Sequence, residues 1–273
     1  MSLSSVCLRE VSGRTGSVYV RGLVIPLLLL FYFFSFTSET SAVGGLSNSK
    51  IIVLSTDTVP QMHVEVEPFF ALEFEDDRDD TVRFGGGLRV TPGLLENLEA
   101  GVNINYLNVE DTQLIRAESD FGDVEAGVKF RLLDEGRGVP FSLAYQGGVT
   151  FPLGDEALWI VEPGGLILTK NFTDKFSMDA DLVFGIIEYD SWSLVTDIGF
   201  GYFLTPWLQA VAEGAYAYED PEAGGGISII NVTGGFTATV AEWLTVIVGV
   251  TPDVYTKNAD KLVAISIAFT FFF

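Results

Sequence analysis

The chain has 273 residues and a formal net charge of −22, with 37 Asp and Glu residues against 15 Lys and Arg residues. An acid excess of this size argues against binding to nucleic acid and against docking on an anionic surface by charge alone. The 29 glycines and the 13% of aromatic residues are poor helix formers, so a mainly helical fold is also disfavoured.

Residues 1–42 predict a cleaved signal peptide. Arg14 and Arg21 precede the apolar run "LVIPLLLLFYFF", and a polar stretch with small residues leads to a cleavage site after Ala42. A membrane anchor is the alternative, but the apolar run of roughly 14 residues is shorter than the ~18–20 that a spanning helix needs. The only cysteine, Cys7, would leave with the signal. Residues 43–61 show no clear period and are interpreted as a periplasmic lead-in.

From residue 62 to the end, short segments alternate large apolar residues with polar or small ones. In residues 122–132, for example, Val128 and Phe130 alternate with Lys129 and Arg131. This period of two is that of a β-strand. It recurs in twelve segments, at residues 63–75, 81–90, 98–107, 122–132, 140–151, 164–172, 175–187, 192–203, 207–218, 227–240, 243–255 and 262–273.

An even number of such segments is typical of a transmembrane β-barrel, because a sheet can cross lipid only by closing on itself. The sequence therefore predicts an all-β fold, a single antiparallel barrel of about 12 strands over residues 62–273, in the bacterial outer membrane. The connections alternate between long acidic loops and tight turns. Since the long loops of such barrels are extracellular, both termini are expected in the periplasm.

The last strand carries large apolar residues on one side and ends on an aromatic residue. Phe269, Phe271 and Phe273 resemble the C-terminal signal by which outer-membrane barrels are recognised by their assembly machinery. That resemblance implies the barrel-assembly machinery as a partner.

The polar side of the strands predicts the residues that line the lumen. The expected set is Glu65, Glu67, Arg83, Arg89, Glu99, Asp123, Glu125, Lys129, Arg131, Asp179, Asp181, Asp197 and Glu213. In the first four strands acids and bases are close enough to pair across neighbouring strands. The acids of the later strands have no base on nearby strands, so either water separates them from the basic wall or Arg83 and Arg89 reach across to them.

Catalysis, metals and cofactors are not expected. A hydrolase would need a nucleophile with a base, and the only histidine, His63, lies at the start of the first strand. The acidic turn "EDDRDD" lacks the glycine and the spacing of a calcium loop.

Residues 121–154, "FGDVEAGVKFRLLDEGRGVPFSLAYQGGVTFPLG", resemble the central hairpin of the outer-membrane family described as transporters of the phenol-degradation meta-pathway. The segments "LTKNFTDKFSMDADLVFG" and "GYFLTPWLQAVAEGAYAY" are similar to the strands that follow in that family. The resemblance implies a barrel that passes aromatic or other hydrophobic compounds.

Two functions remain open on the sequence alone. The first is a channel or transporter that passes small solutes by passive diffusion. The second is a structural or adhesive barrel with a packed, non-conducting lumen. Either would have outer-membrane lipid and lipopolysaccharide as partners, since divalent cations could join the acidic loops to lipopolysaccharide.

Overall fold

A computed structural model describes residues 46–47, 50–76, 81–111, 116–153, 159–188, 191–221 and 225–273, without the side chains of residues 107–121. The predicted signal peptide, residues 1–42, lies outside the described residues. Among the described residues, no helix is long and apolar enough to cross a membrane.

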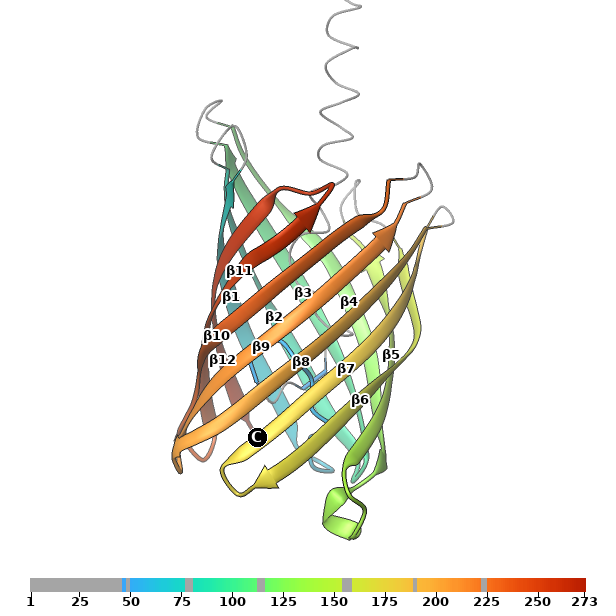
Figure 1. Cartoon of the computed structure of the whole chain (residues 1–273), viewed down its shortest axis with the longest axis vertical. Helices are drawn as coiled ribbons and strands as arrows, with labels where there is room; N and C mark the ends of the chain where they lie inside the picture. The colour runs from blue at the N-terminus through green and yellow to red at the C-terminus, as the bar shows by residue number, and fades with distance from the viewer. Residues whose placement is uncertain are drawn as a thin grey trace, which may run out of the picture. The chain divides into compact units, whose positions relative to one another are not determined.

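The described chain forms a closed barrel of twelve antiparallel strands, as the alternation predicted (Figure 1). The strands are β1 (Val64–Asp76), β2 (Val82–Leu95), β3 (Leu98–Asp111), β4 (Arg116–Leu133), β5 (Ser142–Pro152), β6 (Ile160–Thr173), β7 (Phe176–Ile187), β8 (Ser191–Thr205), β9 (Leu208–Asp220), β10 (Ile227–Ala241), β11 (Leu244–Lys257) and β12 (Lys261–Phe272). A 3₁₀ turn, η1 (Glu135–Arg137), lies between β4 and β5.

Each strand pairs with its neighbours in the chain, and the first strand pairs with the last. The backbone N–H of Val64 donates to the carbonyl of Phe273 at 3.0 Å, and the N–H of Phe273 donates back to Val64 at 3.0 Å. The ladder continues to Asp76 opposite Lys261. No strand is left with an unpaired edge, which is the condition for a sheet in lipid.

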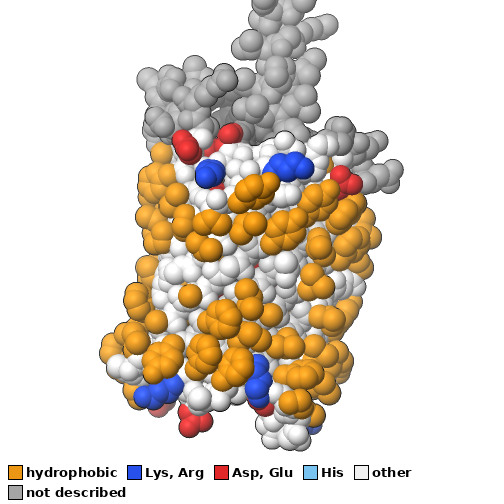
Figure 2. Space-filling model, viewed as in Figure 1, with side chains coloured by type: hydrophobic (Ala, Val, Ile, Leu, Met, Phe, Trp, Pro, Cys, Tyr) orange, Lys and Arg blue, Asp and Glu red, His pale blue; other side chains and the backbone are white. Residues whose placement is uncertain are grey.

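The outer face of the barrel wall is apolar and the inner face is polar, as the alternation predicted. Large apolar side chains that point outward are strongly exposed, including Leu132, Leu166, Phe236 and Val250. In Figure 2 apolar side chains cover the middle of the barrel, and charged side chains gather towards its two ends. An apolar surface of this extent on a closed sheet is that of a membrane-spanning barrel.

Aromatic residues mark the ends of the strands. Trp207 and Trp243 lie at tight turns and are 54% and 53% exposed. At the other strand ends Trp192 packs on Tyr218, with ring centroids 5.1 Å apart. This distribution is typical of the aromatic belts at the two interfaces of a membrane barrel.

Two strands begin several residues earlier than their alternation indicates. One is β4, which begins at Arg116 in place of residue 122, and the other is β6. Residues 164–172 were predicted, whereas β6 begins at Ile160. Gly165 pairs with Gln146, but Glu162 pairs with Gly148, so the register shifts at this point. A bulge moves the inward-facing positions by one residue, which breaks the period of two and hides the first part of the strand.

Candidate functional site: the barrel interior

All thirteen residues predicted to line the lumen occupy inward-facing positions of the strands. Eight of them are buried: Glu67, Arg83, Glu99, Lys129, Asp179, Asp181, Asp197 and Glu213. The other five, Glu65, Arg89, Asp123, Glu125 and Arg131, are half-buried. The inside of the barrel is therefore polar and charged.

On one side of the interior, formed by β1 to β4, bases form ion pairs with acids of the same wall. Arg83 forms an ion pair with Glu75 at 2.7 Å, and Arg89 forms one with Glu67. Of the two alternatives for the later acids, the one in which Arg83 and Arg89 reach across to them is not supported, because both arginines pair with acids of their own wall.

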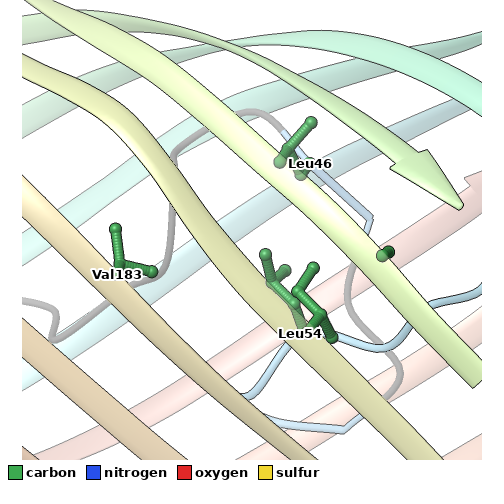
Figure 3. Packing of buried hydrophobic residues seen from close by; sticks show 5 residues of the cluster. Leu46, Leu54 and Val183 are labelled. Carbon is green, nitrogen blue, oxygen red and sulfur yellow. The ribbon is translucent and has the colours of Figure 1, made fainter. Parts of the chain in front are cut away.

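The described residues 46, 47 and 50–59 lie inside the barrel, and we call them the inserted segment. Lys50, Val53 and Leu54 are each 1% exposed or less, and Val59 is 2% exposed. Leu46 and Leu54 pack with Val183 and two further buried residues of the wall (Figure 3). Residues 43–61 were interpreted as a periplasmic lead-in, and most of the described ones lie inside the barrel.

Both ends of the inserted segment bind one carboxylate, Glu99 on β3. The backbone N–H and the hydroxyl of Ser47 donate to Glu99 Oε1 at 2.9 and 2.8 Å. The N–H of Val59 donates to Glu99 Oε2 at 2.7 Å. Lys129, directly opposite Glu99 on β4, lies 3.0 Å from the same carboxylate and donates to the Ser47 carbonyl at 3.1 Å. Glu99 therefore closes the segment into a loop.

The tip of that loop reaches the acidic wall of β7 to β9. The carboxylate of Glu213 accepts the backbone N–H groups of Ile51 and Ile52 at 3.0 Å each, and that of Val53 at 3.3 Å. Successive N–H groups of this kind form an anion-binding nest. The acid of the wall thus binds the backbone of the chain's own N-terminal part.

Two further acids of the wall also bind the inserted segment. Lys50 forms a buried ion pair with Asp179, which also accepts the Thr169 hydroxyl. The N–H of Leu54 donates to Asp181 Oδ2 at 3.2 Å. The expectation that the later acids have no base nearby is therefore wrong for Asp179.

Glycines line the wall at two positions where the inserted segment comes close to it. A Cβ on Gly199 of β8 would lie 2.5 Å from Val53 Cγ1 and 3.1 Å from Lys50 Cδ. A Cβ on Gly249 of β11 would lie 2.8 Å from Ile51 Cγ2. Larger residues at these positions would collide with the segment.

Sequence reasoning missed Lys50, Ser47 and the apolar run that follows Lys50. A signal for them exists in "KIIVL", residues 50–54, because such a run is too apolar for a solvated lead-in. Within the described ranges, no three His, Cys, Asp or Glu side chains converge in the manner of a metal site.

No protein-family model and no curated protein matches the chain. Among solved structures, an outer membrane channel from Pseudomonas putida F1 matches with a TM-score of 0.67 and 12% identity, over 80% of this chain and 98% of that chain. The NanC porin matches with a TM-score of 0.50 and 8% identity, over 76% of this chain and 98% of that chain. The fold is thus that of outer-membrane β-barrels.

Proposed function

We propose that the protein is an outer-membrane channel that passes small solutes by passive diffusion, with the inserted segment restricting its lumen. The observation that supports this function is that the inserted segment fills the interior of the barrel. The inserted segment occupies the middle of the barrel and is bound to the wall by hydrogen bonds and ion pairs. It takes the place that packed side chains of opposite walls would otherwise fill. An eight-stranded barrel is filled by its own side chains, and sixteen strands leave an aqueous channel. Twelve strands here leave space that a chain segment occupies.

Aromatic or other hydrophobic compounds are the solute class that we propose. The inserted segment contributes Leu46 and Leu54 to an apolar cluster with Ala144, Ile167 and Val183 of the wall (Figure 3). An apolar patch in an otherwise charged interior offers a surface on which such a solute can be desolvated. The resemblance of residues 121–154 to transporters of the phenol-degradation meta-pathway points to the same class.

The second candidate is a structural barrel with a packed lumen. The ion pair between Lys129 and Glu99 favours it, because both side chains are fully buried between the wall and the inserted segment. Release of the segment would break the hydrogen bonds that Ser47 and Val59 donate to this buried carboxylate, so these contacts resist release.

Deletion of residues 46–57 distinguishes the two functions. The purified full barrel and the deletion variant would be compared in planar bilayers, with a heat-modifiability gel to show that both barrels are closed. A channel predicts a several-fold higher conductance for the variant than for the complete chain. If the variant is folded and does not conduct, the lumen is packed by the wall itself, and the channel proposal is wrong.

Liposome swelling then addresses the solute class. Vesicles containing the complete chain, which keeps Leu46 and Leu54, would be tested with a small neutral aromatic solute and with a sugar of similar mass. We expect faster entry of the aromatic solute. Equal or slower entry would contradict a preference for hydrophobic compounds without affecting the channel proposal.

A further inference from the structure

Two carboxylates of the acidic wall face each other directly inside the barrel. Asp181 on β7 is the register partner of Asp197 on β8, and both side chains are 3% exposed. Directly opposed side chains of an antiparallel pair have Cβ atoms roughly 4.5–5.5 Å apart, and like charges in that position repel. The pair therefore needs either a shared proton or a positive partner.

Protein donors leave most of this pair unsatisfied. Neither carboxylate oxygen of Asp197 accepts a hydrogen bond within the described residues, and Asp181 Oδ1 accepts none there either. The other oxygen of Asp181 accepts the Leu54 N–H at 3.2 Å. Three buried carboxylate oxygens of the facing pair thus accept no hydrogen bond from any other described residue.

The nearest base is already engaged. Lys50 forms its ion pair with Asp179, two residues before Asp181 on the same strand. Glu213, which adds negative charge beside Asp197, has its oxygens directed at the N–H groups of the inserted segment. One ammonium group therefore faces four buried carboxylates.

We propose that Asp181 and Asp197 bind a divalent cation of the Ca²⁺ class. Buried charges are ordinarily paired or coordinate metal ions. A divalent ion balances two carboxylates, whereas a monovalent ion would leave one charge uncompensated. Carboxylate oxygens are the ligands that Ca²⁺ prefers, and its variable coordination geometry allows water to complete a set that begins with three protein oxygens.

The ion connects the wall to the inserted segment. Asp181 would bind Ca²⁺ through Oδ1 while its Oδ2 accepts the Leu54 N–H, so a single side chain holds both the ion and the segment. With few protein ligands, the dissociation constant is expected near that of extracellular calcium modules, roughly 10⁻⁴–10⁻³ M.

Equilibrium dialysis with ⁴⁵Ca²⁺ tests the site on the complete, folded barrel. The variants are Asp197→Asn and Asp181→Asn, and the matched control is Asp174→Asn, an exposed aspartate in the turn between β6 and β7. An amide at either position can donate to the remaining carboxylate, so both variants are expected to fold.

The wild type and the control should bind one more Ca²⁺ per barrel than either variant, with at least tenfold weaker binding at that site in the variants. Equal stoichiometry in all four proteins would overturn the proposal, because the bound ions would then lie on the surface. Absence of Ca²⁺ binding at 10 mM would overturn it as well. Asp197→Glu, which retains the charge, should keep the additional ion.

Discussion

The ion pair between Lys50 and Asp179 provides a direct test of how the inserted segment is held. Both side chains are 2% exposed, and Lys50 is the only base that the described part of the segment contributes. Lys50→Ala leaves Asp179 buried without its ammonium partner. Breaking a buried pair in this way costs about 3–5 kcal/mol.

The barrel can avoid this cost by releasing the segment, because water then reaches Asp179. At about 1.4 kcal/mol per factor of ten, the equilibrium between bound and released segment shifts by roughly 10²–10³·⁵ towards release. Single-channel recording measures the shift as the fraction of time spent at high conductance. We expect that fraction to rise until it approaches that of the deletion variant.

Two further variants make the result specific. Lys175→Ala removes an exposed lysine from the turn between β6 and β7 and should leave the recording unchanged. Lys50→Met combined with Asp179→Asn replaces the pair by neutral groups of similar size, which is often tolerated, and should restore most of the closed state. A folded Lys50→Ala barrel with the conductance of the wild type would refute the reasoning.

Four further predictions concern other parts of the chain. Replacing Asp181 and Asp197 together by Asn should lower the ratio of cation to anion permeability in the deletion variant, and an anion-selective parent barrel would contradict this. The hydrogen bonds that Lys170 and the backbone N–H of Asn171 donate to Glu135 hold the pKa of that carboxyl below its usual value. The stability that these contacts add is therefore present above about pH 4.3 and is lost as the pH falls below it. The thermal unfolding temperatures of the wild type and of Glu135→Gln should differ at neutral pH and converge in acid. Deleting Phe273 should lower the yield of assembled barrel in cells, and an unchanged yield would contradict its role as an assembly signal. Asp79→Cys, in an acidic loop outside the described residues, should react with an impermeant thiol reagent on intact cells, whereas labelling only after lysis would reverse the predicted orientation.

The barrel could be predicted from the sequence because its rule is local. Each strand alternates residues that face lipid with residues that face the interior, and the alternation alone indicates both the strand and its orientation. The opposition of Glu67 to Arg89 and of Glu99 to Lys129 follows from the same pattern once neighbouring strands are paired. The rule does not hold at the bulge between Glu162 and Gly165, and the predicted start of β6 is wrong there for the same reason.

The inserted segment could not be predicted in this way because its contacts are distant in sequence. Lys50 pairs with a residue 129 positions away, and Ile51 donates to one 162 positions away. No periodic pattern encodes such a contact. Asp179, Asp181 and Glu213 appeared unpaired because they bind backbone N–H groups and one lysine that lie outside the strands.

The two attachment points of the segment differ in a way that indicates how it would be released. Glu99 binds Ser47 and Val59, the two ends of the loop, and Lys129 compensates its charge whether or not the segment is present. Asp179 depends on Lys50, which leaves with the segment. Loss of the tip therefore exposes an uncompensated carboxylate to water, where it is well solvated, while the Glu99 end stays balanced. If release begins at the tip of the inserted segment and the segment pivots on Glu99, no buried charge is left unpaired. The lumen then opens on the side of β7 to β9, where the acidic wall would face the solute path.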